Sequence, residues 1–487
     1  MVTRTATVVG SGPNGLAAAV ALARAGLRVR VLEAQDGIGG GVRTTEATLP
    51  GFRHDVCSAV HPAALASPFF RAFGLGDRLE WLVPDISYAH PLDHGRAAVA
   101  WRDLERTADA LGADARAWRA LLRPLARRID GVVSFTGDQL LRVPAHPVTA
   151  VRYGLRVLEQ ATPLSALTLR TTRGAALFAG VLAHANTRMP SLASAAAGVL
   201  LATQGHADGW GLPRGGAQAI ADALAADLVE HGGTIETGRH VTSLDALDWG
   251  DPSAGDLLVL DTSPRLLLTA SGLPSGYARA IRRYRYGAGV AKVDFALDGP
   301  VPWANAEVAA APTVHLGGTR EEILAAEAEV AAGRVPERPY VLVVQPSVAD
   351  DTRAPAGQAV LWAYTHVPAG SPYDATEAVT RQVERFAPGF RDRVLATRSV
   401  PASERSSINP AELGGDILGG AFTFGQAIKR PVVSRHPWRT PLPGVYLASA
   451  STPPGPAVHG MNGWHAARTA LQDATGFALT LDDLFGG

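Results

Sequence analysis

A glycine-rich turn close to the N-terminus constrains the fold of this chain more than any other feature. A short apolar run at 6–9 precedes the turn and predicts a buried parallel strand. An Ala- and Leu-rich stretch at 16–25 predicts a helix, and residues 27–32 predict a second strand. Together these segments predict a βαβ unit and an α/β fold. The turn itself contains Gly10, Gly12, Pro13, Asn14 and Gly15.

The G-x-G-x-x-G spacing of this turn is typical of dinucleotide binding. The first glycine allows a tight turn, the second lets the backbone approach a pyrophosphate, and the third lets helix and strand pack closely. The helix N-terminus then points N–H groups at the phosphates. Glu33 ends the second predicted strand, where its carboxylate can accept hydrogen bonds from ribose hydroxyls and disfavours a 2′-phosphate. We therefore expect FAD or NAD rather than NADP; the alternative is a purely structural glycine turn.

The composition excludes several other classes of protein. The chain has 487 residues, 47% of them hydrophobic, with 45 basic residues, 45 acidic residues and one cysteine, Cys57. At about 150 residues per domain, this length suggests about three domains or two large interleaved ones. The zero net charge favours neither nucleic acid nor an acidic membrane as the main partner. A single cysteine excludes a CxxC redox pair and favours a reducing cytoplasm.

Targeting signals are also missing from the sequence. No run of about 18 uncharged apolar residues predicts a membrane-spanning helix, and the N-terminus has no signal-peptide pattern. We therefore expect a cytoplasmic protein. Peripheral membrane contact stays open, and the oligomeric state is unknown.

Further elements follow the first βαβ unit. Residues 66–200 have mainly helical patterning. The strands that follow are expected to extend the nucleotide-binding sheet. Helices are predicted at 217–231 and 460–474, and strands at 240–244, 256–260 and 444–448.

A second glycine turn follows Glu33 and consists of Gly39, Gly40, Gly41, Val42 and Arg43. Here the chain resembles the flavin-containing amine oxidase and phytoene desaturase superfamily, whose members place a Gly-Gly-Arg turn just after the ribose-binding glutamate. The resemblance implies FAD as the cofactor, contacted by Gly40, Gly41 and Arg43. Gly41 stands where the family arginine usually is, and Arg43 follows two positions later. A plain glycine loop is the alternative.

The resemblance continues in the middle and at the C-terminal end of the chain. In relatives, the residue that matches Val241 makes backbone contacts to adenine. The segment 445–461 resembles a C-terminal motif in which a strand end and a helix N-terminus meet the pyrophosphate and the flavin ring. The further cofactor-binding residues that it implies are Ala450, Val458, Gly460 and Met461.

The same resemblance implies a two-domain FAD-binding fold of the Rossmann-like, glutathione-reductase type. The FAD-binding domain is expected to be discontinuous, at 1–65, 205–265 and 400–487. An α+β substrate domain is expected to be inserted as 66–204 and 266–399, with the active site between the two domains.

Lys292 and His459 are the candidate catalytic residues. Only two basic residues of the chain are lysines, and Lys292 lies in an apolar segment similar to the amine oxidase strand whose lysine holds a water against flavin N5. A desolvated ammonium there can stabilise developing negative charge; the alternative is an exposed lysine at a sheet edge. His459 stands at the expected flavin end of the last helix, where an imidazole can move a proton. No metal-binding motif is present, so no metal is expected.

These features predict an FAD-dependent oxidoreductase, which is a desaturase, a dehydrogenase or an oxidase. A small organic molecule or a polyene would give a hydride to flavin N5, and O₂ or a quinone would accept the electrons. An amine is a further substrate class, which Lys292 favours. The alternatives are a flavin-dependent isomerase or saturase without net oxidation, and a non-catalytic scaffold protein stabilised by FAD.

Overall fold

The computed structural model describes residues 4–486, and one of its two large sheets is parallel. This sheet has the strand order β16-β10-β1-β2-β9, and all its neighbouring strands pair in parallel. Both ends and the middle of the chain therefore meet in one layer. The strands are β1 Thr5–Val9, β2 Arg28–Leu32, β9 Thr234–Glu236, β10 Leu257–Leu260 and β16 Val445–Leu447.

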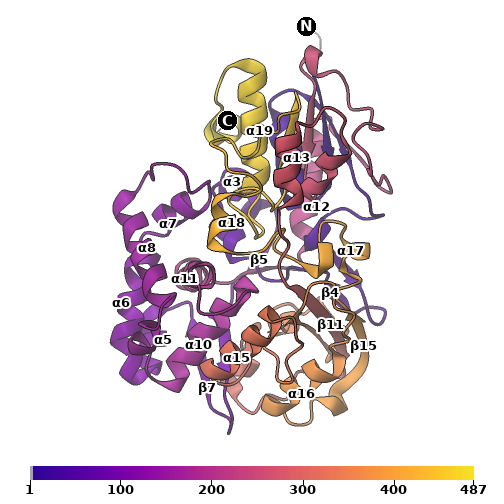
Figure 1. The fold of residues 1–487 in the computed structure, drawn as a ribbon. Helices are drawn as coiled ribbons and strands as arrows, with labels where there is room; N and C mark the ends of the chain where they lie inside the picture. Colours follow the sequence, from indigo (N-terminus) through magenta and orange to yellow (C-terminus); the bar gives the residue numbers. More distant parts are fainter. Residues whose placement is uncertain (1–3, 487) are drawn as a thin grey trace.

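Three helices cover one face of the parallel sheet, in the upper part of Figure 1. Helix α1, Pro13–Arg24, packs against both α12, Gln218–Glu230, and α19, Met461–Thr475. Proline suits the first position of α1, because its fixed φ matches the helix and its missing N–H has no partner there in any case. The small Ala and Val side chains of α1 are buried on all sides, which lets the helix lie close to the sheet and to α19.

The second large sheet has seven strands in the order β15-β11-β14-β13-β12-β6-β7 and is mainly antiparallel. Alternate residues of its central strands face opposite sides. Trp362 and Tyr364 face the helical layer, while Val293 and Leu361 pack on the other side against α16, Thr376–Phe386. The strands are β6 Ile86–Pro91, β7 Ala97–Trp101, β11 Gly289–Leu297, β12 Thr313–Leu316, β13 Val341–Val344, β14 Ala359–Val367 and β15 Val394–Val400.

The helical layer lies at the left of Figure 1, beside the seven-stranded sheet. Helix α11 runs through its centre and contacts α6, α8 and α10. Among the described residues, no helix combines the length and the apolar character that crossing a bilayer requires. The helices are α5 Leu104–Ala110, α6 Ala115–Ala126, α7 Ile129–Thr136, α8 Pro147–Gln160, α10 Thr172–Leu182 and α11 Leu192–Ala207.

The remaining elements are short or connect these layers. The strands are β3 Thr44–Glu46, β4 Arg53–Asp55, β5 Trp81–Leu82 and β8 Leu212–Pro213. The helices are α2 Pro62–Leu65, α3 Pro68–Ala72, α4 Leu75–Arg78, α9 Ser165–Thr168, α13 Ser275–Arg282, α14 Ala306–Ala309, α15 Arg320–Ala331, α17 Arg405–Ile408, α18 Phe424–Ile428 and α20 Leu481–Phe485.

The structure confirms the first βαβ unit and corrects one predicted strand. Residues 240–244 form no strand. The residue before this segment, Arg239, donates its backbone N–H to the Glu33 carbonyl at 2.7 Å. The last residue of the segment, Leu244, donates its backbone N–H to the Thr269 side chain (Oγ1) at 3.0 Å and not to a neighbouring strand. The mainly helical stretch 66–200 also contains β6 and β7, whose paired residues complete the second sheet.

Candidate functional site

A cavity of about 1070 Å³ is lined by residues from both large sheets and from the helical layer. Most of the predicted site residues meet in its wall. Those that line it are Gly10, Gly12, Pro13, Asn14, Glu33, Gly40, Gly41, Val241, Ala450, Val458, His459 and Met461. Those that do not are Gly15, Arg43, Lys292 and Gly460.

The glycine turn holds its backbone close to the cavity in a way that side chains would prevent. Gly10 has φ +99°, in the left-handed region that favours glycine. A Cβ on Gly15 would lie 2.1 Å from the Gly10 carbonyl oxygen, so only glycine allows α1 to begin this close to β1. The Asn14 side chain lines the cavity, and its Oδ1 is buried without a hydrogen-bond partner among the described residues. A glycine turn without side chains and a helix N-terminus fit a bound pyrophosphate, whereas Asn14 Oδ1 is an acceptor and needs a donor group.

Glu33 is held in place at the end of β2. Its Oε2 accepts hydrogen bonds from the backbone N–H of Ser11 at 2.9 Å and from Ser11 Oγ at 2.5 Å. Its Oε1 accepts one from the backbone N–H of Gln35 at 2.9 Å. The carboxylate is thus fixed at the edge of the cavity, where the sequence predicts contact with ribose hydroxyls.

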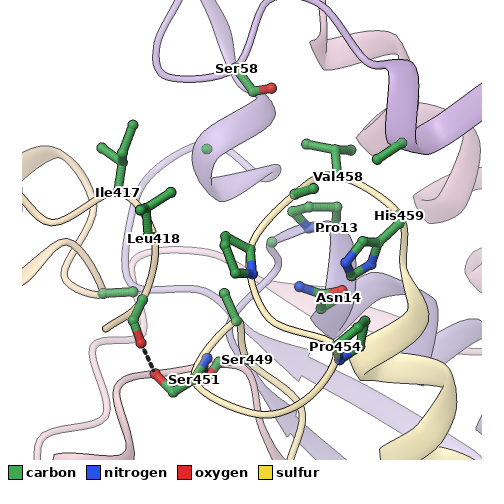
Figure 2. A pocket seen from close by; sticks show the side chains of 18 of the residues that line it. Pro13, Asn14, Ser58, Ile417, Leu418, Ser449, Ser451, Pro454, Val458 and His459 are labelled. Carbon is green, nitrogen blue, oxygen red and sulfur yellow. Dashed lines mark hydrogen bonds between the residues drawn. The ribbon is translucent and has the colours of Figure 1, made fainter. Parts of the chain in front are cut away.

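The C-terminal segment between β16 and α19 forms a loop that curves around the start of α1. Figure 2 shows Ser449, Pro454 and Val458 on this loop, next to Pro13 and Asn14. Asn462 ties the loop together, since its Nδ2 donates to the carbonyls of Ser449 and Thr452. Because the loop is fixed by α19, the positions predicted to contact flavin keep a defined place in the cavity wall.

His459 belongs to this loop and faces the cavity (Figure 2). The backbone N–H of Met461 donates to His459 Nδ1 at 3.1 Å, which places the proton of the neutral ring on Nε2. Burial, with a smaller effect of His465, lowers the pKa of His459 to about 3. At neutral pH the ring is therefore an uncharged hydrogen-bond donor, and its catalytic role stays a prediction.

Lys292 lies on β11, an inner strand of the seven-stranded sheet between β15 and β14, and not on an edge strand. Its side chain is on the same face as Trp362 and Tyr364, which line the cavity, but Lys292 itself does not. The ammonium is paired with Asp294 two residues along β11, and it lies 5.6 Å from the centre of the Trp362 ring. Burial lowers the pKa of Lys292, and Asp294 opposes that shift. The exposed-edge alternative is wrong, and the catalytic role stays a prediction.

Arg43 does not line the cavity. Its guanidinium donates to the carbonyls of Gly40 and Ile408, so it joins the second glycine turn to α17. Gly460 is the residue before α19 and has φ +68°, so it shapes the turn into that helix without lining the cavity.

Asp261 is a site residue that sequence reasoning missed. It directly follows β10, and its Oδ2 accepts a hydrogen bond from the Gly15 backbone N–H at 2.8 Å. Burial raises the pKa of Asp261 to about 7. Asp261 could have been predicted from its position directly after the strand predicted at 256–260, because ligands bind at the carboxyl ends of parallel strands.

The second part of the cavity, here called the cap half, is lined by α7, α8 and α11 and by β13 and β14. It is mainly apolar, and two of its polar groups, Tyr153 and His184, are uncharged at neutral pH. The Tyr153 hydroxyl donates to the Ala196 carbonyl at 2.7 Å, and burial lowers the pKa of His184 to about 3. Apolar side chains in its wall include Val133, Phe135, Val157, Leu200, Leu342 and Trp362.

Carboxylates near the cap half already have partners among the described residues. Glu412 accepts from Arg405 Nε at 2.6 Å, and both side chains are buried. Asp416 accepts from the backbone N–H groups of Gly287 and Leu418, each at 2.7 Å. Asp138 pairs with Arg142 at 3.3 Å. Each of these three carboxylates therefore already accepts hydrogen bonds or pairs with an arginine, although only Glu412 and Asp138 have a cationic partner.

Comparison with known proteins gives a match to one family over most of the chain. The family is described as flavin containing amine oxidoreductase, and the match covers residues 14–471. A rat protein called pyridine nucleotide-disulfide oxidoreductase domain-containing protein 2 is 25% identical over 96% of this chain and 93% of its own length. A 4,4′-diapolycopen-4-al dehydrogenase from Metabacillus indicus is 32% identical over 133 residues, a quarter of each chain.

Solved structures with the same fold include two named amine oxidases. A triple mutant of a putrescine oxidase superposes with TM-score 0.61 and 17% identity, covering 98% of this chain and 99% of its own. Cyclohexylamine oxidase from Brevibacterium oxydans gives TM-score 0.54 and 17% identity, with coverage of 97% and 98%. Together with the family match, these likenesses confirm the predicted fold class, a two-domain FAD-binding α/β fold. The residue ranges predicted for the two domains stay a prediction.

Proposed function

Because this chain belongs to the flavin-containing amine oxidoreductase family, we propose that it dehydrogenates a large, mainly apolar substrate of the polyene class. The cofactor is FAD, as the family match and the fold indicate. The residues of the glycine turn, Glu33 and the C-terminal loop fit this cofactor. The protein is therefore a flavin-dependent oxidoreductase, and the substrate, the acceptor and the mechanism are our proposal.

The apolar character of the cap half is the observation that carries the proposal. Moving an ammonium group from water into an apolar site is unfavourable unless a carboxylate compensates it. The carboxylates nearest the cap half are already bound by arginines or by backbone N–H groups. An apolar chain, in contrast, gains about 25 cal/mol for each Å² that it buries against Val157, Leu200 and Trp362. The local likeness to the diapolycopenal dehydrogenase supports the same substrate class.

The described residues have separate tasks in this proposal. Bound FAD supplies the hydride acceptor. The N-terminus of α1 and the turn bind its phosphates, and Glu33 binds its ribose. His459 holds a proton on Nε2 at the cavity wall and can donate a hydrogen bond from that atom. The apolar side chains of the cap half exclude water and orient the substrate chain.

An amine is the second candidate substrate, because two structures of the same fold are amine oxidases. Their identity to this chain is 17%, so the likeness extends to the fold alone. An amine that binds uncharged fits the cap half better than an ammonium ion, since Glu412 is already paired with Arg405 and Asp416 already accepts two backbone N–H groups.

Product analysis with the FAD-loaded protein tests the proposal. A detergent-dispersed polyene and a primary amine are each incubated with O₂ and, separately, with a soluble quinone. We expect a polyene product with a longer conjugated system, and faster turnover with one of the two acceptors. A product with an unchanged number of double bonds would identify an isomerase. In a parallel anaerobic incubation with dithionite as the reductant of FAD, a polyene with one double bond fewer would identify a saturase. Oxidation of the amine alone would overturn the polyene proposal, and no product from either would favour the scaffold alternative.

A further inference from the structure

Exposed apolar side chains are concentrated in one region of the molecule. Of the 15 large apolar side chains that are exposed in the described part of the chain, nine lie between residues 140 and 167. Single exposed apolar residues are common on protein surfaces, whereas a contiguous group marks an interaction surface. This region contains α8, the loops on either side of it and the first part of α9; α8 lies at the left of Figure 1.

Helix α8 presents these side chains as a stripe. Val148, Val151, Leu155 and Leu158 are exposed by 66%, 64%, 59% and 52%. Their spacing of three, four and three residues places them on one side of a helix. The opposite side of α8, with Tyr153 and Val157, is buried against the core. The helix is therefore apolar on two faces, and only one of them is covered by the fold.

The stripe is continuous with the entrance of the cavity. Leu140, Leu158 and Phe424 line the cavity and are also exposed to solvent. Gln139 Nε2 donates to the Arg435 carbonyl at 2.6 Å, which joins the segment before α8 to the segment after α18. We call residues 140–167 together with 424–435 the docking face. An apolar molecule that leaves this face can enter the cap half without crossing water.

The charge around the docking face is positive. Arg152 and Lys429 are exposed and form no ion pair among the described residues. The acidic residues of the α8 region, Asp138 and Glu159, are each paired with an arginine of that region. The chain has no Asp or Glu between Asp416 and Asp473, a stretch that includes α18. Basic residues beside an apolar helix face suit the interface of a bilayer with anionic headgroups.

We propose that the docking face binds the surface of a bilayer that contains anionic phospholipids, with the entrance of the cavity facing the acyl chains. The valines and leucines of α8 enter the acyl boundary, while Arg152 and Lys429 meet the phosphates. This inference rests on the proposed function, because membrane binding would bring the protein to a polyene substrate that is dissolved in the bilayer. A second copy of this chain fits less well, since a two-fold interface would place the same cations opposite one another.

Flotation with lipid vesicles tests the proposal without any turnover. The full-length, FAD-loaded protein is mixed with phosphatidylcholine vesicles, with or without phosphatidylglycerol. The variant Val148→Gln/Val151→Gln/Leu155→Gln removes the stripe at exposed positions. The control variant Val229→Gln/Val348→Gln/Leu395→Gln changes two valines and one leucine that are exposed elsewhere.

We expect the wild type and the control variant to float with the anionic vesicles, and less so as salt screens the headgroups. The stripe variant should lose at least about tenfold in partitioning, because three apolar side chains no longer enter the bilayer. Arg152→Gln/Lys429→Gln should weaken binding to anionic vesicles only. All variants should oxidise a detergent-dispersed polyene at the wild-type rate.

Equal flotation of the stripe variant and the wild type would overturn the proposal. The proposal would also be overturned if the wild type binds neither type of vesicle. It would be overturned as well if the wild type forms a dimer and the stripe variant is a monomer. If the wild type floats as expected but does not oxidise the polyene, the proposed function would be overturned and the proposed membrane binding of the docking face would still hold.

Discussion

Asp261 places a carboxyl group beside the phosphate-binding turn, where its Oδ2 accepts the Gly15 N–H. Burial raises the pKa of Asp261 to about 7; the Gly15 hydrogen bond opposes this shift, and the charge of Glu33 adds to it. The ionised form repels an anionic pyrophosphate, whereas the protonated form does not. We therefore predict that FAD binds more tightly at about pH 6 than at about pH 8, because Asp261 loses its proton between these values.

Asp261→Asn keeps an oxygen for the Gly15 N–H and removes the titration. Its Kd for FAD, measured by flavin fluorescence on reconstituting the apoprotein, should vary little over this pH range. A carboxyl group whose pKa is higher in the folded state binds more protons there, so its contribution to stability falls as pH rises from about 4 to about 7. In Asp261→Asn this decrease in stability between about pH 4 and about pH 7 should be absent. A pH profile like that of the wild type would show that another group titrates.

Lys292 and Asp294 form a buried pair in which each side chain compensates the other. They are 3% and 2% exposed. Although burial raises the pKa of Asp294, Lys292 and His54 hold it below its usual value. Lys292→Met leaves this carboxylate without its cation, and we predict a loss of about 3–5 kcal/mol in the free energy of unfolding.

The double variant Lys292→Met/Asp294→Leu removes both charges and should recover most of this loss in urea denaturation. If it is stable but no longer reacts with substrate, the Lys292–Asp294 pair has a role in the reaction beyond stability. A double variant as unstable as the single one would contradict the compensating role.

At the scale of elements, the junction between β1 and α1 depends on a close backbone approach. Gly15→Ala would place a Cβ 2.1 Å from the Gly10 carbonyl oxygen, so the turn must shift. Overpacking of this kind costs roughly 1–3 kcal/mol. We predict that the affinity for FAD falls at least about tenfold.

Gly76→Ala is the matched control for this change, because a Cβ on Gly76 of α4 meets nothing within 4 Å. Isothermal titration of the apoproteins with FAD compares the two variants. A Gly15→Ala protein that binds FAD as well as the control would show that the turn does not set the affinity.

The sequence was informative where an element and its ligand groups are neighbours along the chain. The turn from Gly10 to Gly15 and the carboxylate of Glu33 lie within one βαβ unit, so their spacing predicted their arrangement. The strand predicted at 240–244 was wrong because an apolar pattern does not specify a pairing partner. Trp362 and Glu412 were missed because they reach the cavity only when distant segments assemble.

At the scale of the whole molecule, the cavity combines two environments. The glycine turn, Glu33 and the C-terminal loop form a polar part that fits FAD. The cap half is mainly apolar, and the carboxylates Glu412 and Asp416 beside it already accept hydrogen bonds from other groups. Both parts are needed for the proposed reaction, because one binds the hydride acceptor and the other excludes water around the substrate. Ala196 of α11 lines the cap half, so Ala196→Phe should obstruct the substrate without disturbing the polar part.

Anaerobic mixing of the FAD-loaded protein with a polyene tests the central claim most directly. The account predicts that the visible flavin absorbance is lost on mixing with the polyene and persists with a primary amine. Ala196→Phe should bind FAD as the wild type does and should need at least about tenfold more polyene for the same rate of bleaching. Bleaching by the amine alone, or a response to polyene that Ala196→Phe leaves unchanged, would contradict the assignment of the cap half to an apolar substrate.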